Sequence, residues 1–300
     1  MTTKNLSLAE YAMIPIAEIF GKNSGGVPMF ASGSHSKFSI IDYTNIKKNQ
    51  QVRVSGPQLT VDDARTSDAL MSLFALAVTT ISSSMGKHQG QWTLTSSWAA
   101  VAFEMGLRTS LSYAQKNKDR IELSLKKMLR TTFETGTIGF DLPGATGIGF
   151  SGTLIQALVI FSDDDERKVT GDFMVKLNPI SNALLVQTPQ GKLAESNYGQ
   201  YAHLNRESAR ACTSDSAYQM LRRFSHQINA GESKTYSIDT IVDFCRGSNL
   251  TKQQRRHTRS TIIESGIPQI QKLVGWKVVK DKNMFTFTRA VKEKINKNKC

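Results

Sequence analysis

The stretch that most constrains the fold runs from residue 236 to residue 289 and predicts a short helix, a turn and a basic helix. Ser237 is of a type that caps helix N-termini, and the apolar residues after it repeat with the helical period. Gly247 can end this first helix in a left-handed conformation. Ser248 and Asn249 then precede the start of a second helix. The pattern therefore predicts two helices joined by a tight turn.

Two strands are expected directly after the basic helix. Residues 276–280 and 284–288 alternate between apolar and polar types, and Asp281, Lys282 and Asn283 between them predict the turn of a hairpin. The exposed residues of this hairpin are largely basic. Two helices followed by a hairpin are typical of a winged helix, in which the second helix enters a DNA groove and the hairpin contacts phosphate.

The second helix carries a candidate DNA-binding face. Four of its cations are spaced i, i+3, i+4 and i+7, so on a helix they share one side. A charged run is most often a solvated surface, but residues 252–300 contain 13 Lys and Arg against 3 Asp and Glu, which favours a polyanionic partner. We expect arginines to read guanine, glutamines to read adenine and lysines to contact phosphate; the candidates are Arg255, Arg256 and Arg259, Gln253 and Gln254, and Lys252, Lys277, Lys280 and Lys282.

One straight helix does not fit the residues that follow these cations. Ile263 and Ile270 project to about the same side as Arg256 and Arg259, and Pro268 cannot donate a helical hydrogen bond. We therefore expect a kink or break near residues 266–268. The part before it would contact DNA, while the part after it would pack on the core.

The first half of the chain predicts a second unit with the same element order: core helix, short strand, short helix, longer basic helix and hairpin. The expected ranges are 68–85, 92–95, 97–105, 115–133 and 137–161 in the first half and 214–229, 234–236, 237–246, 252–273 and 276–289 in the second. Element order repeats here, but residue identity does not. The pattern predicts an α+β fold with two tandem winged-helix domains. In the first unit the candidate DNA contacts, for which a solvated face is the alternative, are Lys116, Lys118, Arg120, Lys126 and Lys127.

A chain of 300 residues is longer than a single small core needs, which also favours two domains. We expect a partly flexible N-terminal arm at 1–50 with some strand character at 37–43. The remaining expected parts are an N-terminal winged-helix domain at 51–190, a C-terminal winged-helix DNA-binding domain at 197–290 and a basic tail at 291–300.

Cysteine usage and hydropathy point to a cytoplasmic protein. Cys212, Cys245 and Cys300 are odd in number and lack metal-ligand spacing, which favours a reducing compartment. The start of the chain does not resemble a signal peptide, and the longest apolar stretch, 69–81, is too short to span a bilayer. The lysine-rich end has no apolar face to insert, so the net charge of +13 favours a nucleic acid over a membrane.

The sequence contains no recognisable catalytic, metal or cofactor motif. The acidic run 163–166 is of a type most often found in a solvated turn between strands. The five histidines form no HxH or HxxxH pair, and residues 231–235, GESKT, lack the Gly-Lys pair of a nucleotide-binding loop. We therefore expect no enzyme activity, no metal and no cofactor.

Several blocks of the sequence resemble plasmid replication initiators of the IncQ RepC type. Between residues 198 and 290 the runs SDSAYQMLRRF, YSIDTIVDFC, KQQRRHTRSTIIESGIPQIQKLVGW and MFTFTRA resemble the C-terminal half of that family. The runs SGPQLTVDDARTSDALMSLFALAV and DFMVKLNPISNALLV resemble two blocks of its N-terminal half, in the same order. The resemblance spans about residues 52–290.

The resemblance implies a function that charge and periodicity alone do not give. It implies tandem winged-helix domains that bind direct repeats (iterons) in double-stranded origin DNA as a monomer or weak dimer. It also implies melting of an adjacent AT-rich segment and recruitment of a plasmid-encoded helicase and primase by a protein that is itself no enzyme. The alternative is a winged-helix transcriptional repressor, which predicts a two-fold dimer on a palindromic operator. An enzyme of nucleic-acid processing is disfavoured by the absent motifs.

Overall fold

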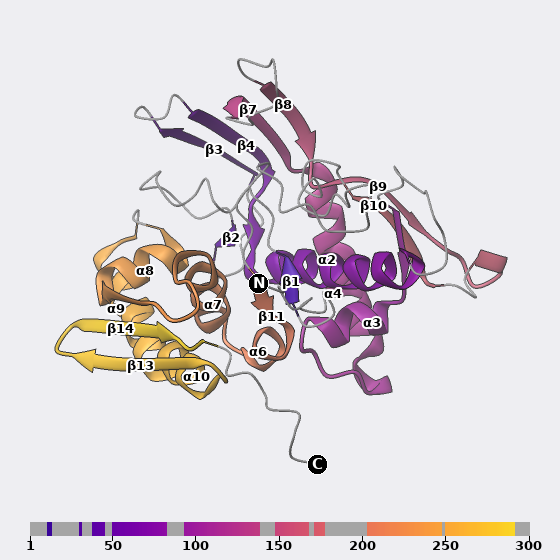
Figure 1. Ribbon diagram of the computed structural model, residues 1–300. Helices are drawn as coiled ribbons and strands as arrows, with labels where there is room; N and C mark the ends of the chain where they lie inside the picture. The colour runs from indigo at the N-terminus through magenta and orange to yellow at the C-terminus, as the bar shows by residue number, and fades with distance from the viewer. Residues whose placement is uncertain are drawn as a thin grey trace, which may run out of the picture.

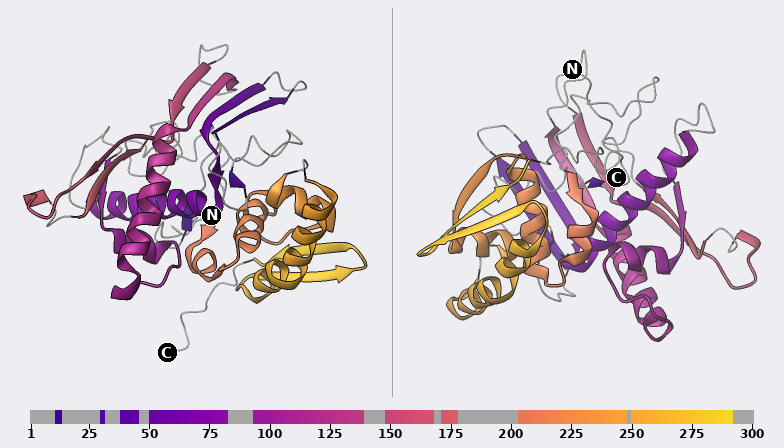
Figure 2. Two further views of the ribbon diagram at one scale, coloured as in Figure 1. Left: turned by 180° about the vertical axis from the view of Figure 1, so that it is seen from behind. Right: turned by 60° about the horizontal axis from the view of Figure 1, so that its bottom comes forward.

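The computed structural model describes residues 11–13, 30–31, 38–45, 50–82, 93–138, 148–167, 171–177, 203–247 and 250–291. These residues form two α+β units that lie side by side (Figure 1). Views from behind and from a tilted direction show the same arrangement (Figure 2). Each unit contains a three-stranded antiparallel sheet with helices packed against it.

The C-terminal unit is a winged helix, as the sequence predicts. A short strand β11 (His203–Asn205) and a short helix α6 (Arg206–Ala211) precede it. The strand order of its sheet is β12-β14-β13, so the strand after the first helix pairs with the last strand of the hairpin. The elements in chain order are α7 (Asp215–Gln227), β12 (Ser233–Ser237), α8 (Ile238–Arg246), α9 (Lys252–Thr261), α10 (Ile267–Lys272), β13 (Trp276–Asp281) and β14 (Met284–Arg289).

Local capping signals set the helix ends of this unit. The Ser237 hydroxyl accepts a hydrogen bond from the backbone N–H of Thr240 at 3.1 Å, and the Ser214 hydroxyl accepts one from Ala217 at 3.1 Å. At the other end of α8, Gly247 has a φ of +86°, a conformation that glycine adopts without steric cost. These caps confirm the predicted starts of α7 and α8 and the predicted end of α8.

The N-terminal unit has the same topology. Its sheet has the order β6-β10-β9, which matches β12-β14-β13 strand for strand. The chain therefore contains two tandem winged helices. The elements of the first are α2 (Val61–Ser82), β6 (Thr93–Ser96), α3 (Trp98–Glu104), a 3₁₀ turn (Leu111–Tyr113), α4 (Ala114–Arg130), β9 (Ile155–Ile160) and β10 (Phe173–Leu177).

The prediction that the hairpin at 137–161 forms the wing of this unit is wrong. Strands β7 (Thr132–Ile138) and β8 (Ile148–Thr153) instead join β3 (Phe38–Asn45) and β4 (Gln50–Pro57) in a separate sheet of order β3-β4-β7-β8. The strand expected to run unbroken over 149–161 is divided at Leu154, after which β9 pairs with β10. The wing is therefore β9 and β10, because β7 is already paired with β4.

Two helix boundaries in the structure differ from those that the sequence predicts. Helix α2 begins at Val61 and not at residue 68. The Asp63 carboxylate in its first turn accepts hydrogen bonds from the N–H of Thr60 at 2.6 Å and from the Thr60 hydroxyl at 2.9 Å, which links the helix start to the residue before it. Helix α4 ends at Arg130, and Phe133 belongs to β7. The helix expected after Asn178 lies outside the described residues.

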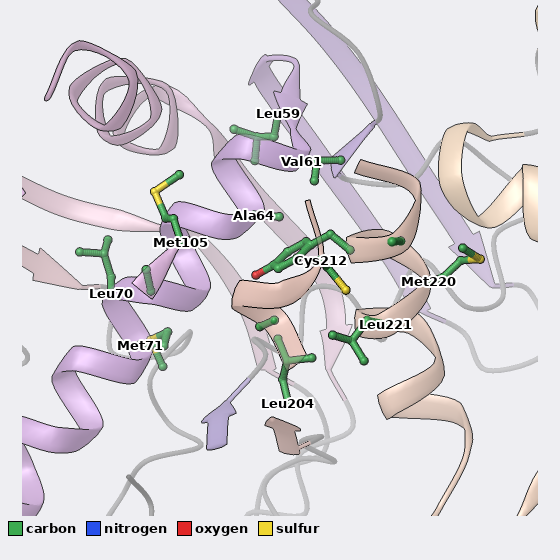
Figure 3. Close-up of a cluster of buried hydrophobic side chains, with 14 of the residues drawn as sticks. Leu59, Val61, Ala64, Leu70, Met71, Met105, Leu204, Cys212, Met220 and Leu221 are labelled. Atoms are coloured by element: carbon green, nitrogen blue, oxygen red, sulfur yellow. The ribbon is translucent and has the colours of Figure 1, made fainter. Parts of the chain in front are cut away.

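The two units share one hydrophobic core. Residues of α2 and of the strand before it meet residues of β11, α6 and α7 in a single buried cluster (Figure 3). Short strands from the N-terminal region support this junction, since β1 (Tyr11–Met13) pairs with β11 and β2 (Phe30–Ala31) pairs with β5 (Leu59–Thr60). The labelled side chains of the cluster are Leu59, Val61, Ala64, Leu70, Met71 and Met105 from the first unit and Leu204, Cys212, Met220 and Leu221 from the second.

Candidate nucleic-acid interface

Helix α9 is held in a fixed rotation by its first turn and its buried face. The Thr251 hydroxyl accepts a hydrogen bond from the N–H of Gln254 at 3.2 Å, and the Gln254 side chain accepts one from the N–H of Thr251 at 3.0 Å. This capping box occupies a glutamine that the sequence proposed as a base-reading residue. Thr258 and Ile262 are buried and turn one side of the helix inward.

The side of α9 opposite Thr258 faces outward. Gln253, Arg256 and Ser260 are spaced i, i+3 and i+7, lie opposite the buried residues and are exposed. Lys252 and His257 border this row and are exposed as well. We name the five residues Lys252, Gln253, Arg256, His257 and Ser260 the outward face of α9. It combines two cations with donors and acceptors suited to base edges and phosphate.

The remaining two arginines are directed toward α8. Arg259 Nη2 donates to Asp239 Oδ1 at 2.7 Å, and Arg255 Nη2 donates to Asp243 Oδ1 at 2.6 Å. Arg255 Nη1 also lies 3.6 Å from Asp239 Oδ1. The hydrogen bond from Arg259 lowers the pKa of the Asp239 carboxyl. The four cations expected on one face are thus divided into an outward pair and a pair that bridges two helices.

Instead of the kink or break predicted near residues 266–268, the helix contains a π-helical turn, Ile262–Gly266, that continues directly into α10. Pro268 supplies no N–H to continue the α-helical ladder. The wider turn re-phases the helix, so that Ile262 and Ile267 are both buried although they are five positions apart. Gly266 is buried against α7, where a Cβ would lie 2.7 Å from Met220 Cε and 3.3 Å from Ser216 Cβ.

The hairpin of β13 and β14 presents basic side chains on both of its faces. Lys282 lies in its turn with a φ of +52°, and Asp281 pairs with Met284, which makes the turn shorter by one residue than expected. Lys280 lies opposite the buried Phe285, on the face that packs against α10. Lys277 lies opposite Thr288 on the other face. All three lysines are exposed.

The candidate cations of α4 have several different environments. Lys116 and Lys126 are exposed on the outer side of the helix, where Lys126 pairs with Glu122 at 2.5 Å, and Lys118 is half-buried. Arg120 forms an ion pair with Asp62, and Lys127 lies 3.3 Å from the buried carboxylate of Asp63, so both are directed toward α2. The wing of this unit differs from the C-terminal wing, since the acidic run 163–166 lies in the loop between β9 and β10.

A buried ion pair that the sequence does not predict joins the two units. Arg222 of α7 donates from Nε to Asp68 Oδ2 at 2.7 Å and from Nη2 to Asp68 Oδ1 at 2.9 Å, and the Tyr218 hydroxyl donates to the same carboxylate at 2.7 Å. Burial raises the pKa of Asp68, and the Arg222 guanidinium opposes that shift. The usable sequence signal is an Asp and an Arg at positions where helices otherwise bury apolar residues.

A second set of ion pairs connects α3 and α6. Glu104 is buried and pairs with Arg206, while Arg210 lies 3.4 Å from the same carboxylate. Arg65 of α2 stacks over the Tyr218 ring at 4.1 Å and donates to the Ser214 carbonyl oxygen at 3.3 Å. With the shared core, these contacts fix α4 and α9 relative to each other.

Other kinds of site are not found in the part of the chain that the structure describes. Its His, Cys, Asp and Glu side chains form no group of three or more that could hold a metal ion. None of its helices combines the length and the apolar character needed to cross a membrane.

Comparison with known proteins supports the tandem architecture. No protein-family model matches the sequence, and no curated protein matches it. Two crystal structures of RctB domains 2 and 3 match in fold, one of them a selenomethionine derivative. Their TM-scores are 0.54 and 0.52 at 11% and 13% sequence identity, and each alignment covers 87% of this chain and 95% of the other. The likeness shows that both winged helices and their order are shared.

Proposed function

We propose that this protein is a replication initiator that binds direct repeats at a plasmid origin. In this proposal it promotes melting of a neighbouring AT-rich segment and helps to load a plasmid-encoded helicase and primase. Three observations support it: the tandem winged-helix fold, the basic outward face of α9 and the sequence blocks that resemble IncQ RepC-type initiators. RctB, whose domains 2 and 3 have the same fold, is also a replication initiator.

The observation that carries the proposal is the fixed junction between two unlike winged helices. The shared core and the Asp68–Arg222 pair hold α4 and α9 in one body. A single chain therefore offers two different recognition helices, and its preferred DNA site has no two-fold symmetry. Several such sites in one orientation form a row of direct repeats, whereas a palindrome suits a two-fold dimer.

The site preference can be measured on DNA of random sequence, so the origin itself is not needed. The full chain is incubated with random duplexes, and the bound fraction is amplified and sequenced over several rounds. We expect one asymmetric site of about two helical turns, bound by one chain. The DNA next to the gene should contain this site repeated in one orientation. A palindromic site that binds two chains would instead support a transcriptional repressor.

Melting is tested on a supercoiled plasmid that carries the selected repeats beside an AT-rich segment. Bending by several bound chains can supply the few kcal/mol needed to open such a flexible segment. We expect added protein to make thymines in the AT-rich segment reactive to permanganate. Reactivity that stays at its protein-free level on saturated repeats would contradict the melting step while leaving repeat binding in place.

A further inference from the structure

Helix α8 contributes two carboxylates to the surface that carries the candidate DNA contacts. Asp239 and Asp243 are one helical turn apart, as are Arg255 and Arg259 on α9, and the two spacings match. Their side chains retain 50% and 39% exposure, so the pairs lie at the surface and are open to competition by another anion. Each arginine has at least one carboxylate oxygen within 2.7 Å.

The cations of the outward face have a different environment. Within the described residues, no carboxylate lies within ion-pair distance of Lys252 or Arg256. A duplex that approaches α9 therefore meets two available cations and two that are already neutralised. To contact Arg255 or Arg259, a DNA phosphate has to displace a carboxylate of α8.

We propose that Asp239 and Asp243 are specificity-determining residues that keep Arg255 and Arg259 out of nonspecific phosphate contacts. This inference rests on the proposed DNA-binding function and assigns different roles to the cations of α9. The outward face of α9 contacts any duplex, while the α8 carboxylates compete with phosphate for Arg255 and Arg259. Nonspecific affinity is thereby reduced, because fewer counterions are released from DNA of unrelated sequence.

The N-terminal unit is arranged differently. On α4 the cations Arg120 and Lys127 are paired with Asp62 and Asp63, but these acids lie on α2, which corresponds to α7 and not to α8. Lys126, on the exposed side of α4, is also paired, with Glu122 of the same helix at 2.5 Å. The proposal therefore applies to α9 alone.

The salt dependence of binding to a random-sequence duplex tests this inference. The logarithm of the binding constant falls with the logarithm of the salt concentration by about 0.9 for each phosphate contact. We expect the double substitution Asp239→Asn with Asp243→Asn to steepen this slope by about 1.8, since two arginines become available. Glu207→Gln in α6 is the matched control, because it removes an exposed carboxylate that is not paired with α9; its slope should equal that of the unaltered protein.

A second variant tests the same inference from the opposite direction and does not depend on α8 tolerating the change. With Arg255→Gln and Arg259→Gln, the slope on random duplex should stay at the unaltered value, because these arginines do not contact nonspecific DNA. A slope that becomes shallower by about 1.8 would overturn the inference and leave the proposed function intact. Melting temperatures of both variants report whether the fold is retained. Absence of any duplex binding by the unaltered protein would overturn the proposed function and this inference together.

Discussion

The carboxylate of Asp68 in α2 and the guanidinium of Arg222 in α7 form a two-point hydrogen-bonded ion pair whose side chains are 4% and 0% exposed. The pair joins two domains, and it lies within the core that they share. A buried charge without its partner is strongly unfavourable, so the pair couples the stability of one winged helix to that of the other.

We expect Arg222→Met to lower the free energy of unfolding by about 3–5 kcal/mol, because Asp68 would remain buried without its counter-ion. Denaturant unfolding followed by circular dichroism measures this loss. Arg120→Met is the matched control, since its pair with Asp62 is 36% exposed on each side and should cost less than about 1 kcal/mol. Equal losses for the two variants would show that the junction is no stronger than a surface contact.

Cysteine reactivity reports separately on the junction and on the C-terminal unit. Burial raises the pKa of Cys212, which lies at the junction, to about 12, and burial raises the pKa of Cys245, inside the C-terminal unit, to about 12. At pH 8 the thiolate fraction is therefore about a thousandfold below that of a thiol of ordinary pKa. In a Cys300→Ser background we expect neither cysteine to react with a thiol reagent until the protein unfolds locally or globally.

Arg222→Met should change this pattern selectively. Because the substitution weakens the junction, Cys212 should be labelled faster than Cys245, as measured by mass spectrometry of peptides after timed labelling. Simultaneous labelling of both would mean that the C-terminal unit does not retain its fold when the junction opens.

A glycine at the end of α3 permits the close approach of the two units. Gly106 has a φ of +74°, and a Cβ there would overlap the Arg210 carbonyl oxygen and lie 2.9 Å from the Arg210 Cα. Gly106→Ala should therefore cost about 1–2 kcal/mol for the left-handed conformation and a further ~1–3 kcal/mol for the overlap. Gly275→Ala is the control, because its φ of +83° is similar and nothing lies within 4 Å of its Cβ. The melting temperature should fall further for Gly106→Ala; the reverse order would contradict a close contact at Arg210.

The two faces of the C-terminal hairpin should differ in DNA binding. Lys280 lies on the side of α10, so Lys280→Ala should weaken binding to any duplex and reduce the salt slope by about 0.9. The sequence also predicts a phosphate contact for Lys277, but this lysine projects from the opposite face, so Lys277→Ala should leave the slope unchanged. Titrations of a labelled duplex at several salt concentrations measure both. A larger effect at Lys277 would place the DNA on the other side of the hairpin.

The sequence predicts those parts of the fold that depend on nearby residues. Ser214, Ser237 and Gly247 act on backbone groups within a few positions, and each has its predicted role. A π-helical turn lies close to the predicted discontinuity, but the conflict that predicted it is real only in part, because Ile270 is buried whereas Ile263 is exposed. Topology of the C-terminal unit follows from these local signals, because its elements are consecutive in the chain.

Features that depend on distant residues do not follow from the sequence in this way. Asp68 and Arg222 are 154 positions apart, and no local pattern links them. The sequence assigns the N-terminal wing to the wrong hairpin because β7 pairs with β4, a strand that precedes the first helix of the unit. On α9, periodicity places four cations together, but only the position of α8 decides which of them are paired with Asp239 and Asp243. Asp239 and Asp243 are four residues apart, as are Arg255 and Arg259, and this shared spacing is a sequence signal for ion pairs between α8 and α9.

If one chain binds one asymmetric site through both winged helices, the hydroxyl-radical footprint on that site should respond separately to a substitution in each domain. Arg256→Ala alters the outward face of α9, and Lys126→Ala alters the exposed side of α4. On the selected site we expect each substitution to reduce protection in a different half, about one helical turn from the other. Loss of protection in both symmetric halves of a palindrome from Arg256→Ala, with no effect of Lys126→Ala, would contradict binding of one chain through both winged helices.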